Sequence, residues 1–245
     1  MSNTIHGSDG DQFKVDTSQR LSLGQEMRFP DGRRFRYAKA PSGGTAVVVA
    51  KLYQAAIPVT NHVLQTATAA AAGDSTVLLA LGGTAVSADQ YRDGYLVVDL
   101  AANTGFGYIY QIGPHGNVAA SGTFRVPLRG TVQVAIATTA NSVSLVPNNY
   151  SDIILAVATT PTAVLVGVSQ KPIAAGSFGW ILVAGTTTCL TQGTVVKGTI
   201  VKPGTAAGSL APQASTLDLE TQTVGICTRV ATTTDYSTFC ITLLE

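Results

Sequence analysis

The apolar residues of this chain come in short runs that are flanked by Gly, Thr or Asn. Thr, Val and Ala dominate the composition, and only three Glu and two Met are present among 245 residues. Long helices favour Glu, Lys, Leu, Met and Arg, whereas Thr and Val suit a pleated strand. The sequence therefore predicts an all-β protein: an N-terminal extended arm with a hairpin, followed by two small β-sandwich or β-barrel-like lobes. The Ala-rich stretch 66–72 is compatible with one short helix or with an extended loop.

The charge content limits the partners that the protein can have. Charged residues make up 12% of the chain, about half the usual share, and 15 basic and 14 acidic residues leave a net charge of +1. Without a basic surplus to contact phosphates, nucleic acid is not an expected partner. No apolar run approaches the length of about 18 residues that a membrane helix needs, so no membrane association is expected either.

Cysteine and histidine positions argue against a disulfide framework, a metal site or a cofactor. The three cysteines, Cys189, Cys227 and Cys240, are an odd number, and the N-terminal residues lack a secretory signal pattern. We therefore expect reduced thiols in a protein made in a cytoplasm, with Cys227 and Cys240 buried on strands. The histidines lie far apart in the sequence, and no Cys-x-x-Cys pair occurs, so no metal ligand set is predicted: His6, His62, His115.

Charge is concentrated at the N-terminus, and this suggests the domain organisation. Residues 1–40 carry 12 of the 29 charges and show little apolar periodicity, as in an arm that lacks a core of its own. A Gly-rich link ends this part, and an Asn-rich stretch near position 150 marks a second boundary. The predicted parts are the arm and hairpin (1–44), a β-rich lobe (45–150) and a C-terminal β-barrel-like lobe (151–245).

The arm ends in a predicted hairpin, which is the candidate partner-binding site. Pro30-Asp31-Gly32 forms a turn, because Pro fixes φ at the first central position and Gly accepts a positive φ. Aromatic residues alternate with arginines on either side, which gives the hairpin an aromatic side and a basic side. The hairpin is either a small solvated element or a clamp whose aromatic side docks on a partner and whose arginines meet its carboxylates. The clamp residues are Phe29, Arg33, Arg34, Phe35, Arg36 and Tyr37.

The sequence gives no pattern that indicates an enzyme. It contains no Gly-x-Ser-x-Gly, and its histidines are predicted to be surface or structural residues, so no serine triad is expected. Asp89, Asp93 and Asp99 are the densest carboxylates beyond the arm, and they are predicted to form a solvated hairpin rim. No catalytic residue is therefore assigned.

Two segments resemble a known family. They are Phe29–Lys39 (Phe-Pro-Asp-Gly-Arg-Arg-Phe-Arg-Tyr-Ala-Lys), with the small-residue strand Thr45–Tyr53 after it, and Val166–Trp180, which ends in Ala-Ala-Gly-Ser-Phe-Gly-Trp. Together they resemble the capsid decoration proteins, also called cement or head-stabilising proteins, of tailed bacteriophages. The resemblance implies a non-catalytic all-β protein that is made in the host cytoplasm and binds the outside of an icosahedral capsid in the virion. Its implied partners are the major capsid protein and further copies of itself, commonly as a homotrimer.

Two other functions remain open at this point. One is a host-recognition or glycan-binding module, whose site would use aromatic residues that otherwise pack across paired strands: Tyr91, Tyr95, Phe106, Tyr108, Tyr110. The other is a β-rich major shell or tube subunit. A glycan array tests the first, and the copy number in purified particles tests the second.

Overall fold

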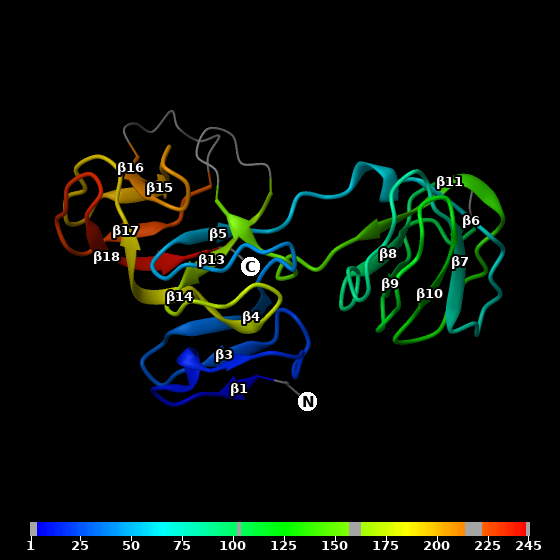
Figure 1. Ribbon diagram of the computed structural model, residues 1–245, viewed down its shortest axis with the longest axis horizontal. Coiled ribbons are helices and arrows are strands. Elements are labelled where there is room, and N and C mark those ends of the chain that lie inside the picture. The colour runs from blue at the N-terminus through cyan, green and yellow to red at the C-terminus, as the bar shows by residue number, and fades with distance from the viewer. Residues whose placement is uncertain (1–3, 102–103, 157–162, 214–221, 244–245) are drawn as a thin grey trace. The chain divides into compact units, whose positions relative to one another are not determined.

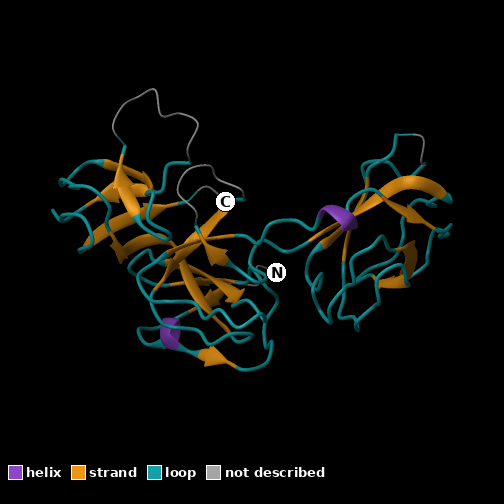
Figure 2. Ribbon diagram, turned by 45° about the horizontal axis from the view of Figure 1, so that its top comes forward, coloured by secondary structure: helices purple, strands orange, loops and turns teal. Residues whose placement is uncertain are grey.

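The computed structural model describes residues 4–101, 104–156, 163–213 and 222–243 (Figure 1). It confirms an all-β protein: the described helical segments are two single turns of 3-10 helix, Asp11–Phe13 and Thr60–His62 (Figure 2). The chain forms two compact units. Unit 1 combines residues 1–56 with 149–245, and unit 2 consists of residues 57–148.

The longest strand, β14 (Phe178–Leu190), organises unit 1 (Figure 1). Its first half pairs with β4 (Arg34–Lys39), which also pairs with β3 (Glu26–Arg28). On its other edge this half pairs with β2 (Val15–Asp16) and β13 (Leu165–Ser169), and β1 (Ile5–His6) pairs with β3. The N-terminal segment is thus part of the main sheet.

The second half of β14 belongs to a small barrel. Beyond a register shift between Leu182 and Ala184, β14 pairs with β18. The sheet then continues through β17 and β15 to β16, and the Gln192 N–H donates to the Leu210 carbonyl at 2.8 Å, which returns β16 to the end of β14. The bounds of these strands are β15 Ile200–Pro203, β16 Leu210–Pro212, β17 Gly225–Cys227 and β18 Tyr236–Thr242.

Two short strands attach the residues at the boundary between the units to unit 1. β5 (Leu52–Gln54) pairs with β13 and with β12 (Ile154–Leu155). The register Ile154–Gln54 shows that the chain leaves unit 1 and re-enters it on neighbouring antiparallel strands. Unit 2 is therefore an insertion between β5 and β12.

Unit 2 is a curled six-stranded antiparallel sheet in the order β10-β7-β6-β11-β8-β9. A bridge between Ile112 and Leu128 joins its two edge strands, supported by the Gly113 N–H donating to the Pro127 carbonyl at 2.7 Å. Among its described residues, eighteen form a buried core, including Leu79, Tyr91 and Phe124. The strand bounds are β6 Gln65–Ala67, β7 Thr76–Ala80, β8 Tyr95–Val98, β9 Ile109–Gln111, β10 Thr123–Pro127 and β11 Thr139–Val146.

The structure corrects the predicted organisation of the N-terminal part. The segment 1–44 is not an arm without a core, because Leu23, Met27 and Phe35 are buried in the same hydrophobic cluster as residues of β14 and β18. The predicted lobe 45–150 begins too early, since β5 pairs within unit 1. The stretch 66–72 begins with the end of strand β6 and contains no described helix.

Candidate functional site

The hairpin around Pro30-Asp31-Gly32 exists as predicted. The Phe29 N–H donates to the Arg33 carbonyl at 2.9 Å, and the Gly32 N–H donates to the Phe29 carbonyl at 3.1 Å. Gly32 has φ +87°, the left-handed conformation that glycine adopts at little cost. The turn chemistry of the sequence is therefore confirmed.

The aromatic side of the hairpin does not face a partner. Phe29, Phe35 and Tyr37 are 6%, 0% and 1% exposed and belong to the core of unit 1. The Tyr37 ring centroid lies 5.2 Å from that of Trp180 and 5.9 Å from that of Phe178. The prediction that these three aromatic residues dock on another protein is wrong, because their contact area is already covered by this chain.

The arginines of the hairpin meet carboxylates, but those of their own chain. Arg33 Nη2 lies 3.0 Å from Asp9 Oδ1, and Arg33 Nε lies 2.6 Å from Asp31 Oδ2. Its guanidinium also stands 4.7 Å from the centroid of the Phe29 ring. A hydrogen bond from the Arg33 side chain is the main cause that lowers the pKa of Asp9. For Asp31 the main cause of a lowered pKa is the hydrogen bond from the Arg33 backbone N–H.

The other two arginines are also engaged within unit 1. Arg36 Nη2 lies 3.2 Å from Glu26 Oε2, and Arg36 Nη1 donates to the Gly24 carbonyl at 3.0 Å. Arg34 is half-buried and lies opposite Arg28 in the β3–β4 ladder. The Arg36 side chain therefore links β4 to β3 through Glu26 and is not free to serve as the basic half of a clamp.

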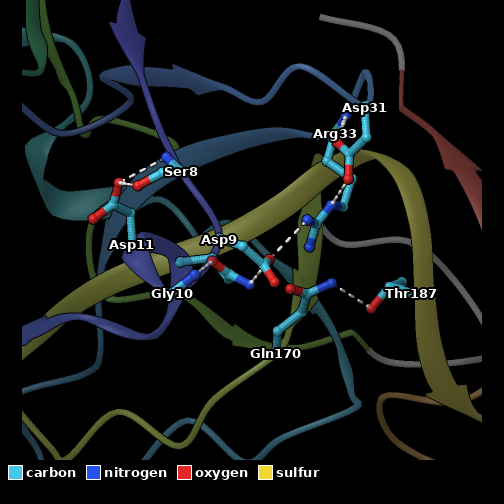
Figure 3. Close-up of polar contacts among 9 residues, drawn as sticks. Ser8, Asp9, Gly10, Asp11, Asp31, Arg33, Gln170 and Thr187 are labelled. Carbon is cyan, nitrogen blue, oxygen red and sulfur yellow. Dashed lines mark hydrogen bonds and ion pairs between the residues drawn. The ribbon is translucent and has the colours of Figure 1, made fainter.

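A groove lies beside the hairpin tip, and we call it the threonine groove. Its volume is about 430 Å³. Within its lining the Gln170 side-chain amide donates to Thr187 Oγ1 at 3.1 Å, and Arg33, which also lines the groove, pairs with Asp9 and Asp31 (Figure 3). Hydroxyl, amide and apolar groups make up most of this lining, which suits binding by hydrogen bonds and contact. The groove residues are Phe13, Arg33, Val49, Ala50, Ser169, Gln170, Thr186, Thr187, Thr188 and Thr238.

A second surface feature crosses the outer face of the small barrel, and we call it the apolar row. It consists of Thr186, Cys240, Ile226 and Ile200, which lie opposite one another on β14, β18, β17 and β15. Ile226 and Ile200 are each 47% exposed, and Cys240 is exposed as well. The prediction of a buried Cys240 is therefore wrong, whereas Cys227 is buried as predicted. Sequence alternation separates the two faces of β18 but does not say which face is outside.

The aromatic residues of unit 2 divide into two groups. Tyr91 and Tyr110 are buried, and Tyr91 Oη lies 2.5 Å from Nδ1 of the fully buried His62. Tyr95, Phe106 and Tyr108 are each more than 40% exposed. Burial thus removes two of the five aromatic residues from any carbohydrate-binding face.

The predicted carboxylate rim of unit 2 is not uniformly solvated. Asp93 is fully buried and pairs with Arg129, while the Asn148 side chain donates to the Asp93 carbonyl at 3.0 Å. Asp89 is half-buried and accepts a hydrogen bond from the His115 N–H at 2.9 Å. These carboxylates are therefore structural links around the β8–β9 end of the sheet.

Comparisons with known proteins complete the description of the site. Within the described ranges, no group of three or more His, Cys, Asp or Glu residues is placed to hold a metal ion. No helix in the described part of the chain is long and apolar enough to cross a membrane. Comparison of the chain with protein-family models, with curated proteins and with solved structures gave no match.

Proposed function

We propose that this protein is a non-catalytic structural protein of a virion that binds the outer surface of an icosahedral capsid and stabilises it. The observation that carries the proposal is the pairing of the two segments that resemble decoration proteins. Phe29–Lys39 and Val166–Trp180 are far apart in the sequence, yet β4 and β14 are hydrogen-bonded neighbours over Phe178–Leu182. The resemblance therefore rests on one folded module and not on two unrelated stretches.

The apolar row supplies the surface for capsid binding in this proposal. It presents Cys240, Ile226 and Ile200 side by side on the outer face of a sheet. Apolar residues that are grouped on a surface mark protein interaction sites more often than scattered ones do. On a capsid lattice, many such contacts of modest strength add through multivalency, and trimers of this chain would multiply them further.

Binding to undecorated capsids tests this proposal. Purified protein is added to heads of the virus that encodes the chain, prepared without this protein, and occupancy is measured after sedimentation. Wild-type protein is expected to saturate the heads, and Ile226→Arg is expected to lower the affinity at least about tenfold, as expected for a charge in an interface centre. Val230→Arg is the matched control, because Val230 is 57% exposed and lies outside the apolar row.

Two results would count against the proposal. Failure of wild-type protein to bind heads contradicts capsid decoration altogether. Equal binding of Ile226→Arg and Val230→Arg to the heads would be compatible with capsid decoration, but it would show that the apolar row is not the contact surface. Analytical ultracentrifugation of the free protein tests the trimer separately.

A glycan-binding function is the second candidate, and the exposed aromatic residues of unit 2 favour it. Tyr95, Phe106 and Tyr108 are 42%, 53% and 41% exposed, and aromatic faces bind sugar rings by stacking. A glycan array probed with the protein tests this function. Signals that disappear in Tyr95→Ala and Tyr108→Ala variants would support it, and an array without signals would reject it.

A further inference from the structure

The backbone of β14 has one edge that is covered over only part of its length. In an antiparallel pair, alternate residues direct their N–H and C=O groups toward the partner strand. The Thr191 N–H donates to the Asp235 carbonyl at 2.8 Å, and the Leu243 N–H donates to the Val183 carbonyl at 3.1 Å. The β14–β18 register is continuous between these two bonds. The N–H and C=O groups of the odd-numbered residues of β14 therefore point toward β18, and those of the even-numbered residues point toward the opposite edge.

The opposite edge is occupied at both ends and open between them. Ala184 lies opposite Arg34 of β4, and the Leu190 N–H donates to the Ala50 carbonyl at 3.0 Å. In the described ranges, no strand pairs with this edge between those two contacts. Thr186 and Thr188 therefore direct their backbone groups into the threonine groove, where the Thr187 hydroxyl makes one long contact of 3.5 Å with the Thr188 carbonyl.

The rest of the groove is also suited to an extended peptide. Phe13 and Val49 line it with side chains that are 44% and 41% exposed, which gives an incoming side chain apolar surface to cover. At the hairpin end, the side chains of Asp9 and Asp31 are 81% and 52% exposed and share the single cation Arg33. This end therefore carries one net negative charge and favours a basic residue in the bound segment.

We propose that the threonine groove binds an extended peptide segment of a partner protein by β-strand addition to Thr186–Thr188, with a Lys or Arg of that segment beside Asp9 and Asp31. Backbone hydrogen bonds to the open edge fix the register of the bound peptide, and Phe13 and Val49 provide apolar contact area for its side chains. The open edge spans few residues, so the peptide needs only a short extended stretch. The proposal does not depend on capsid binding.

Hydrogen exchange of the free protein is the first test. The amides of Thr186 and Thr188 are expected to exchange much faster than those of Thr187 and Cys189, which face β18. Equal protection of all four amides would mean that the edge is already closed and would overturn the proposal.

Peptide selection is the second test. A displayed library of random peptides is selected on the immobilised full-length protein and counter-selected on Thr188→Pro, which lacks the edge N–H. Proline is tolerated where the strand N–H has no partner, and the melting temperature checks the fold of the variant. Thr188→Val is the matched control, because valine keeps the backbone N–H and nearly the same side-chain shape.

Selected peptides are expected to be rich in β-branched residues with one Lys or Arg near an end. Their affinity should fall about fivefold to tenfold in Thr188→Pro, the equivalent of one or two lost hydrogen bonds, and stay within about twofold in Thr188→Val. Asp9→Lys, which changes a well-exposed side chain, is expected to weaken the same peptides and serves if Thr188→Pro does not fold.

Three results would overturn the proposal. The first is a selection that enriches no peptide. The second is a set of peptides that bind wild type, Thr188→Pro and Asp9→Lys equally. The third is self-association of the wild-type protein that is lost in Thr188→Pro, which would make a second copy of this chain the occupant.

Discussion

At the scale of single residues, Tyr37 shows how unit 1 uses a polar group in its core. The ring is 1% exposed and packs between Phe178 and Trp180, while its hydroxyl donates to Asp16 Oδ2 at 2.8 Å. Burial and the bond to Asp16 raise the pKa of the Tyr37 hydroxyl above its ordinary value. The residue thereby ties β4 to the short strand β2. The alternation of aromatic and basic residues in the hairpin suggested that Tyr37 contacts a partner, but the side chain belongs to the core.

Replacing Tyr37 by Phe removes this hydrogen bond and keeps the ring. We expect Tyr37→Phe to lower the free energy of unfolding by about 1.5–3 kcal/mol, the usual value for a hydrogen bond to a charged group. Urea denaturation followed by Trp180 fluorescence measures it. Tyr236→Phe, at a tyrosine that is 46% exposed, is expected to stay within about 0.5 kcal/mol of wild type. Equal stability of the two variants would show that the Asp16 bond contributes nothing.

Cys189 makes the stability of unit 1 depend on alkaline pH. Burial raises the pKa of this thiol from 9.0 to about 12. The thiol of the unfolded chain loses its proton above about pH 9, while that of the folded chain keeps it, so the unfolded state binds fewer protons there. The stabilising effect is complete below about pH 9 and is lost as the pH rises toward 12.

We therefore expect the free energy of unfolding to fall between about pH 9 and about pH 11, with a slope of up to about 1.4 kcal/mol per pH unit from this one group. Cys189→Ala should reduce the slope. Denaturant titrations across this range measure the slopes. Parallel curves for wild type and Cys189→Ala would rule out the thiol as the cause.

At the scale of elements, β14 pairs with β4 over its first half and with β18 over its second half, and the change of partner falls near Gly185. Gly185 has φ +107°, and a Cβ at this position would lie 2.8 Å from Arg33 Cγ and 3.0 Å from Arg33 Cα. The close approach lets the hairpin tip cross over the strand where pairing passes from β4 to β18. A side chain at this position would separate the hairpin from the barrel.

Gly185→Ala is expected to lower the free energy of unfolding by about 1–3 kcal/mol, because alanine at this φ is strained and its Cβ meets backbone as well as side chain. Gly43→Ala is the control, since nothing lies within 4 Å of a Cβ there and its φ is ordinary. Thermal and urea unfolding of both variants measure the difference. A Gly185→Ala protein as stable as Gly43→Ala would mean that the crossing needs no glycine.

At the scale of the whole molecule, local patterns of the sequence were more informative than long-range ones. The all-β class, the turn at Pro30-Asp31-Gly32 and the alternation of the hairpin follow from residue types within a few positions. The full length of β14 is not evident from the sequence, because Gly185 and the threonines after it resemble the end of a strand. Residues 194–201 have the composition of a strand, but they are largely a turn, with Gly198 at φ +88° and β15 starting at Ile200.

The candidate site shows the same limit. The aromatic side of the hairpin can be recognised in the sequence. Whether that side faces a partner or the chain's own core depends on segments that are distant in sequence. Phe35 is buried because β4 pairs with β14, and β14 lies more than half the chain away. The threonine groove could not be predicted for the same reason, since its lining comes from the N-terminal segment, β13, β14 and β18.

The division into two units leads to a last prediction about folding. Among the residues that the structure describes, the core of unit 2 comes from 57–148 alone, and the two core clusters of unit 1 contain none from that range. A unit with a core of its own can fold alone. Because residues 54 and 154 are neighbours on antiparallel strands, a short Gly-Ser linker can replace the insertion without stretching unit 1.

We expect residues 57–148 to unfold cooperatively as an isolated protein, and unit 1 with the linker to keep its hydrogen-exchange pattern. Differential scanning calorimetry of the full chain should then show two transitions that match those of the separate units. The Asp93–Arg129 pair gives a specific check, because Asp93 is fully buried although Arg129 is 38% exposed, and losing a hydrogen bond to a charged group costs about 1.5–3 kcal/mol. Asp93→Ala should shift only the transition of unit 2. A single transition that moves as a whole in Asp93→Ala would show instead that the two units unfold together, and an unfolded isolated unit 2 would show that its core depends on unit 1.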